Sequence, residues 1–154
     1  MKARLDYRDA APKGFAAIAH LNHYVENCGL EESLLELVKM RASQINGCAF
    51  CLDMHSKDAV ATGENPQRLY TLPAWRETPF FTDRERAALA WTEAVTRIAE
   101  SHIDDALYEE ARRQFSEQEL VNLTLAVITI NGWNRLAIPF HSEVGGYQPG
   151  QYRK

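Results

Sequence analysis

The chain has 154 residues, of which 45% are hydrophobic and 25% charged, and its formal net charge is −4. This length predicts one domain with a substantial core, and the acidic balance argues against nucleic acid as a partner. No apolar run is long enough for a transmembrane helix or a secretory signal. We therefore expect a cytoplasmic protein without membrane contact.

Proline, glycine and helix-capping residues divide the sequence into helical segments, and long alternating β-branched runs are absent. The pattern predicts an all-α fold, a compact bundle of about six to eight helices. We expect a single domain over residues 1–154, with its core at about residues 15–140 and an irregular C-terminal tail.

The expected elements follow in chain order, beginning with an extended arm over residues 1–12. Helices are expected at about residues 14–27, 31–45, 48–61, 66–70, 82–100, 104–114, 120–130 and 133–138. Residues 71–81 include two prolines and are expected to form a loop, and Asn131-Gly132 is expected to kink or divide the last helix. Capping boxes begin at Thr82 and Ser116, and Asp104 is expected to cap the helix between them.

Three cysteines are present, and an odd number does not indicate a secreted disulfide framework. In a reducing cytosol, a close pair such as Cys48 and Cys51 is more often catalytic or metal-binding than structural. Cys28 lies at a helix end with no nearby partner in the sequence, so we expect it to be inert packing.

The cysteine pair is spaced for chemistry on one helix face. Cys48, Cys51 and His55 follow the turn at Asn46-Gly47 and occupy positions i, i+3 and i+7. Unpaired N–H groups at a helix N-terminus favour the thiolate, which is the nucleophilic form of cysteine. His55, one turn beyond Cys51, is placed to accept the Cys51 proton. If the preceding helix packs antiparallel, Glu36 returns beside His55 and orients its imidazole.

Other interpretations of the same residues stay open. Cys48, Cys51 and His55, with Glu36 as a fourth ligand, are possible zinc ligands, although ligands so close on one helix make a tetrahedron hard to close. Glu36 alone is also compatible with an ordinary solvated helix position. A redox-sensing helical oligomer, in which the cysteine pair alters a partner contact without turnover, is a third possibility.

The segment from Glu36 to His55 resembles the signature of alkylhydroperoxidase D-like (AhpD-like) proteins. In it, eleven residues separate Glu36 from Cys48, two separate Cys48 from Cys51, and three separate Cys51 from His55. These proteins belong to the carboxymuconolactone decarboxylase superfamily. Segments 82–91 and 131–135 are also similar, so the resemblance covers about residues 15–150. It implies an all-α fold, homo-oligomers that are trimers or hexamers, and peroxidase activity without a haem, flavin or metal cofactor.

The resemblance also implies roles for individual residues. Cys51 would attack the peroxide, while Cys48, as the more exposed cysteine, would resolve the sulfenic acid and exchange with a dithiol reductant. His55 and Glu36 would form the proton relay. Decarboxylase members lack the cysteine pair, so its presence argues against lactone decarboxylation. Well-known peroxidase members carry a second histidine directly before the later cysteine, where this chain has Phe50, which cannot relay a proton.

Large apolar side chains are dense in the C-terminal third of the chain. This surplus indicates either a filled monomer core or a subunit interface. The residues concerned are Ile128, Ile130, Trp133, Leu136, Ile138, Phe140 and Tyr147.

Overall fold

The computed structural model describes residues 2–152, which form eight α-helices and one 3-10 helix, with no strand among them. The elements are α1 (Tyr7–Ala10), α2 (Pro12–Glu26), α3 (Glu32–Asn46), α4 (Ala49–Ala61), α5 (Pro66–Thr71), η1 (Leu72–Glu77), α6 (Asp83–Thr96), α7 (Asp105–Gln114) and α8 (Glu117–Phe140). The predicted all-α fold class is confirmed. Over the same residues, no helix combines the length and apolar character needed to cross a membrane.

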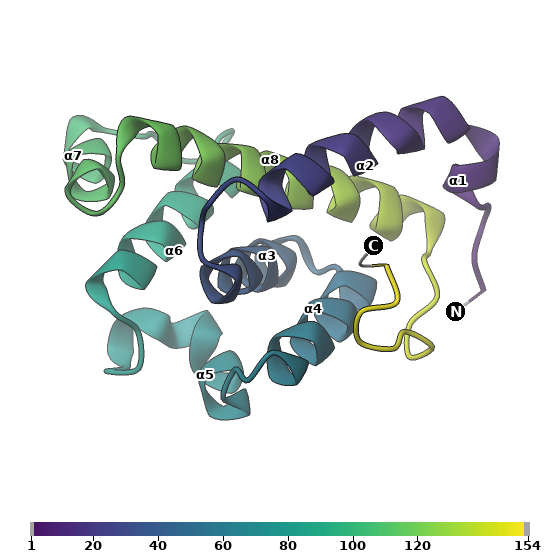
Figure 1. Cartoon of the computed structure of the whole chain (residues 1–154), viewed down its shortest axis with the longest axis horizontal. Coiled ribbons are helices and arrows are strands. Elements are labelled where there is room, and N and C mark those ends of the chain that lie inside the picture. Colours follow the sequence, from purple (N-terminus) through teal and green to yellow (C-terminus); the bar gives the residue numbers. More distant parts are fainter. Residues whose placement is uncertain (1, 153–154) are drawn as a thin grey trace.

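Helix α3 occupies the middle of the molecule and packs against α4, α6 and α8 (Figure 1). Every residue from Leu34 to Met40 is buried, including the charged Glu36 and Lys39. A helix that is covered on several sides places its polar side chains against neighbouring helices rather than in water, so these two charges need partners within the fold.

Three clusters of buried apolar side chains form the core around α3. The largest joins α2, α3, α6, α7 and α8, and a second lies between α3, α4, α5, η1 and α6. The third contains Cys48 and Cys51 together with Ala42 of α3 and Ile130 and Ala137 of α8. The cysteine pair is therefore part of the hydrophobic core.

Local capping signals fix several helix starts as expected. Thr82 and Ser116 each form a complete capping box, and the Asp104 side chain accepts a hydrogen bond from the Leu107 N–H at 2.9 Å. The helix that begins after Thr82 ends at Thr96, earlier than the predicted boundary near residue 100.

Two segments that were expected to lack helix contain short helical turns. In the predicted extended arm, Asp6 accepts the Arg8 N–H at 2.8 Å and caps the one-turn helix α1. In the predicted loop 71–81, the 3-10 helix η1 carries Pro73 in its first turn. Proline is tolerated there because N–H groups in the first turn have no hydrogen-bond partner within the helix. The first difference reflects a side-chain cap and the second a proline in a helical first turn, and a composition-based prediction of loop captures neither.

The expected break at Asn131-Gly132 is wrong, because α8 runs without interruption to Phe140. Asn131 donates from its side chain to the Val127 carbonyl at 2.9 Å within the same helix. Gly132 serves packing instead, since a Cβ at this position would lie 2.8 Å from Cδ1 of Ile18 on α2. Glycine at this position therefore leaves room for the end of the Ile18 side chain where α2 meets α8.

We expect Gly132→Leu to lower the free energy of unfolding by about 1–3 kcal/mol, because the new side chain overpacks the contact with α2. Gly14→Ala is the matched control: its Cβ would meet Ala11 at an ordinary 3.9 Å. This control should gain up to about 1 kcal/mol from helix propensity. Urea unfolding followed by circular dichroism measures both, and wild-type stability in Gly132→Leu would contradict the close approach.

Candidate active site

The turn between α3 and α4 presents the cysteines. Gly47 ends α3 with φ +70°, a left-handed conformation that glycine adopts without steric cost. The Cys48 N–H then donates to the Ser43 carbonyl at 3.0 Å, and Cys48 becomes the N-cap of α4. Its sulfur accepts the Cys51 N–H at 3.4 Å. The sulfur of Cys48 thus lies where the helix N-terminus stabilises negative charge.

Cys48 and Cys51 are joined in a disulfide, with their Cα atoms 5.4 Å apart. The expectation that Cys48 is the more exposed member is wrong, because each cysteine is only 1% exposed. The reason is that the first turn of α4 packs against Ala42 and Ile130, which cover the helix N-terminus. The two cysteines still differ, because Cys51 lines the neighbouring cavity and Cys48 is not among its described lining residues.

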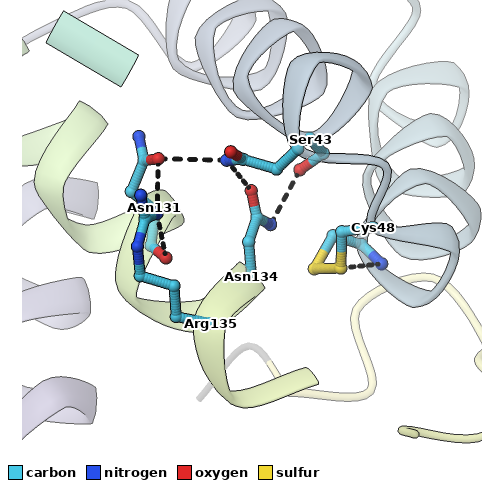
Figure 2. Close-up of a disulfide and its surroundings, with 7 residues drawn as sticks. Ser43, Cys48, Asn131, Asn134 and Arg135 are labelled. Atoms are coloured by element: carbon cyan, nitrogen blue, oxygen red, sulfur yellow. Dashed lines mark hydrogen bonds between the residues drawn. A yellow bond between two sulfur atoms is a disulfide. The ribbon is translucent and has the colours of Figure 1, made fainter. Parts of the chain in front are cut away.

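A network of polar side chains clamps this turn to α8 (Figure 2). The Asn46 amide donates to the Oδ1 atoms of Asn131 at 3.0 Å and Asn134 at 2.8 Å. Asn134, which is fully buried, donates in turn to the Ser43 hydroxyl at 3.1 Å. Sequence reasoning missed this supporting role. The available signal was a pair of asparagines three residues apart, Asn131 and Asn134, among the large apolar residues of the second half of α8.

Helices α3 and α4 bring Glu36 and His55 together, as the antiparallel packing predicted. Oε2 of Glu36 lies 2.9 Å from Nδ1 of His55, and the two residues are 2% and 7% exposed. Burial opposes ionisation of Glu36, but the hydrogen bond and charge of His55, together with Lys39, outweigh it and lower the pKa of Glu36 to about 2. With the carboxylate on Nδ1, a neutral imidazole carries its proton there and keeps Nε2 as the acceptor.

Lys39 completes this cluster and was missed by sequence reasoning. Its Nζ lies 3.0 Å from Oε1 of Glu36 and 4.0 Å from Oε1 of Glu26, and the residue is 6% exposed. The available signal was a lysine within the apolar stretch Leu34–Met40, one turn after Glu36.

A cavity of about 410 Å³ lies against these groups. Cys51, His55, Glu36 and Lys39 line it, whereas Cys48 is not among the described lining residues. Much of the remaining wall is aromatic. The rings belong to Tyr7, Phe15, Phe50, Trp133, Tyr147 and Tyr152. A molecule in this cavity therefore meets the Cys51 side of the disulfide, a proton acceptor and an apolar surface.

The C-terminal tail closes one side of the cavity by binding along α4 (Figure 1). The Tyr147 hydroxyl donates to the buried Asp58 carboxylate, with its oxygen 2.8 and 2.9 Å from the two carboxylate oxygens. Asp53 accepts the Gly145 N–H at 3.1 Å. The tail is therefore a defined wall, although it contains no helix between residues 141 and 152.

Two other expectations concern sulfur and metal. Cys28 is a free, half-buried thiol that packs against the largest core cluster, in agreement with a packing role. Within residues 2–152, no group of three or more histidine, cysteine and acidic side chains is arranged to hold a metal ion. The geometry thus gives no support to the zinc interpretation.

The sequence profile of the carboxymuconolactone decarboxylase family matches residues 11–94, which include Glu36, both site cysteines and His55. The chain belongs to the carboxymuconolactone decarboxylase family. Members similar to it include the uncharacterized YdfG of Bacillus subtilis strain 168, with 40% identity over 138 residues, 90% of this chain and 94% of YdfG. The uncharacterized YnjA of Escherichia coli K12 is 31% identical over 113 residues, 73% of this chain and 59% of YnjA.

A solved structure extends this family relationship to the whole fold. A protein of unknown function from Agrobacterium tumefaciens, described as an antioxidant defence protein of the AhpD type, is 44% identical to this chain. The two superimpose with a TM-score of 0.91, covering 95% of this chain and 100% of that one. The AhpD-like fold is thereby shown for this family member.

The acidity of Glu36 predicts a pH dependence of stability. Because folding lowers the pKa of Glu36 from 4.5 to about 2, its contribution is complete above about pH 4.5 and is lost as the pH falls through about 2. Glu36→Gln should therefore flatten the fall in stability between pH 4.5 and 2. At pH 7 it should be about 1.5–3 kcal/mol less stable than wild type, because hydrogen bonds to a charged group are lost.

Glu117→Gln is the matched control, since Glu117 is exposed and its carboxylate lies 3.6 Å from Arg112. Denaturant unfolding at a series of pH values measures all three proteins. Equal slopes for wild type and Glu36→Gln below pH 4.5 would show that the buried carboxylate does not govern this transition.

Proposed function

We propose that this family member is a thiol-dependent peroxidase that reduces organic hydroperoxides with the Cys48–Cys51 pair, without a bound cofactor. One observation carries the proposal: Cys51 and a carboxylate-bound imidazole, one helical turn apart, line the same cavity. A nucleophile, a base and a group that orients the base are the parts needed for thiol activation.

The first step consumes the peroxide. In the reduced protein, Nε2 of His55 accepts the Cys51 proton, and the N-terminus of α4 stabilises the thiolate. The Cys51 sulfur attacks the O–O bond, forming a sulfur–oxygen bond and releasing an alkoxide. The imidazolium returns the proton to this leaving group, which departs as the alcohol and leaves Cys51 as a sulfenic acid.

The second step forms the disulfide. The Cys48 thiol condenses with the sulfenic acid, and water leaves as the S–S bond forms. A dithiol reductant then restores both thiols through a mixed disulfide and becomes a disulfide itself. Because each cysteine is only 1% exposed, this exchange needs either a local opening around Cys48 or a small dithiol that enters the cavity and meets Cys51.

The cavity supports an organic hydroperoxide rather than hydrogen peroxide as the substrate. At about 410 Å³ it falls within the range of small-molecule sites, and hydrogen peroxide would leave most of it unfilled. Phe15 and Trp133 pack edge to face across its wall, with ring centroids 5.6 Å apart. Such a surface stabilises a bulky apolar or aromatic group attached to the peroxide.

A redox sensor is the second candidate, and the burial of both sulfurs favours it. A sensor needs one oxidation event per subunit and no rapid access for a reductant. The two functions differ in stoichiometry. With a dithiol present, a peroxidase consumes many equivalents of peroxide per subunit, whereas a sensor stops near one.

We further propose that the protein acts in the cytoplasm as a homo-oligomer, a trimer or hexamer. The C-terminal apolar surplus is divided between core and surface: Ile130 and Tyr147 are buried, whereas Ile128 and Ile138 are 50% and 40% exposed. Val121, two turns before Ile128 on α8, is 59% exposed. Exposed apolar side chains on one helix support a contact between subunits.

Serine substitutions separate the roles of the cysteines. We expect Cys51→Ser to abolish peroxide consumption. Cys48→Ser should turn over more slowly than wild type, since the sulfenic acid then has no resolving thiol and must react directly with the supplied dithiol. Cys28→Ser, the matched control, should keep the wild-type rate. Peroxide loss is followed with a dithiol supplied. The mechanism is wrong if Cys51→Ser and Cys48→Ser both turn over like wild type.

Phe50 tests the proton relay. It lines the cavity between the two cysteines, at the position where related peroxidases carry a second histidine. Phe50→His should raise the turnover rate several-fold by adding a proton-transfer group. Phe50→Leu is the control, because it removes the ring without adding a base and should bring no gain. Equal rates for the two variants would mean that proton relay does not limit turnover.

A further inference from the structure

We propose that Lys39 is a positioning residue of this site, whose ammonium group balances the buried Glu36 carboxylate and so keeps His55 a neutral imidazole that can accept the Cys51 proton. This inference rests on the proposed peroxidase function. It assigns a task to a buried charge that the thiol chemistry above does not use.

The geometry places Glu36 between Lys39 and His55. Oε1 of Glu36 lies 3.0 Å from Nζ of Lys39, and Oε2 lies 2.9 Å from Nδ1 of His55. The side chains of Lys39, Glu36 and His55 are 8%, 3% and 8% exposed. Water therefore screens these charges weakly, and the charge on each group strongly affects the others.

Charge balance then determines the state of the imidazole. A carboxylate alone beside a buried histidine favours the imidazolium, because the added proton neutralises the site. An imidazolium has protons on both nitrogens and cannot act as a base. With Lys39 present, the ammonium already neutralises Glu36, and a further proton on His55 would leave the cluster positively charged. Lys39 thus favours the form of His55 that thiol activation needs.

The other charged groups around the cluster do not replace Lys39. Those lining the main cavity are Arg8 from α1, His23 and Glu26 from α2, and Asp58 from α4. The Glu26 side chain is 37% exposed and lies 4.0 Å from Nζ of Lys39, so water screens it more than Glu36. Asp58 is held by the Tyr147 hydroxyl and by the Gly150 N–H at 3.0 Å.

Further charges approach Glu36 from α5 and α6. A second cavity of about 260 Å³ brings Glu64, Arg68 and Glu85 to the other side of Glu36. Arg68 is itself paired with both Glu64 and Glu85, so this group adds no uncompensated positive charge. The ammonium of Lys39, by contrast, is in direct ion-pair contact with the Glu36 carboxylate.

A purely structural role is the competing interpretation, in which Lys39 only ties α3 to Glu26 of α2. Such a role predicts lower stability, and a lower rate that is the same fraction of wild type at every pH. A positioning role predicts a change in the pH dependence itself. It also predicts that arginine rescues the function, because it keeps the positive charge.

The test compares Lys39→Met and Lys39→Arg with wild type and with Lys13→Met, which removes the same charge from an exposed position on α2. In the reduced proteins, NMR follows the His55 ring protons against pH, and peroxide loss is measured over the same range. In Lys39→Met we expect the His55 titration midpoint and the acid limb of the rate profile to move up together by at least about one pH unit. Lys39→Arg and Lys13→Met should match wild type.

Lys39→Gln is the second variant if Lys39→Met does not fold, and it should give the same upward shift, because it keeps a hydrogen-bonding group without the charge. An unchanged His55 midpoint in a folded, uncharged variant overturns the inference. Failure of the proposed function is a separate result: if wild type stops after one equivalent of peroxide, the protein is not a peroxidase. The NMR midpoints still decide whether Lys39 controls His55.

Discussion

The burial of one carboxylate, that of Glu36, is the constraint on which the site depends. A charge 2% exposed in the middle of α3 is tolerated only with partners at hydrogen-bond distance, and those partners come from its own helix and from α4. Satisfying Glu36 therefore fixes how α4 lies against α3. Since α4 also carries Cys51 one turn before His55, the same interaction determines where the reactive sulfur lies.

The N-terminal end of α4, which carries the cysteines, is held by side-chain hydrogen bonds. Asn46, Ser43 and Asn134 form a buried hydrogen-bonded network that ties the turn at Gly47 to α8. Hydrogen bonds of this kind are directional, so they position a turn more strictly than apolar contacts do. Helix α4 is thus anchored at its start by amides and at its second turn by the hydrogen bond between His55 and Glu36. Cys51 lies between the two anchors, which limits how far its sulfur can move.

Much of this arrangement follows from local sequence signals, and the rest does not. Capping residues such as Thr82 and Ser116 act within four residues, so the helix starts could be predicted. The pairing of Glu36 with His55 could be predicted because a short turn forces antiparallel packing. The role of Gly132 could not, because it depends on Ile18, more than a hundred residues away in the chain. Burial of Cys48 and the approach of Lys39 to Glu26 likewise depend on contacts between helices.

Phe50 is close to the site cysteines in the sequence and also belongs to the cavity wall. It lies between the cysteines on the first turn of α4, and its ring is part of the cavity wall. A histidine at this position would add a proton carrier but would interrupt an apolar surface that continues through Phe15 and Trp133. Phe50 thus continues the apolar cavity wall at a position where its side chain cannot carry a proton. In the proposed peroxidase, a bulky substrate bound against this wall would have its peroxide group aligned with Cys51. Binding energy far from the reacting atoms would then lower the barrier of the chemical step.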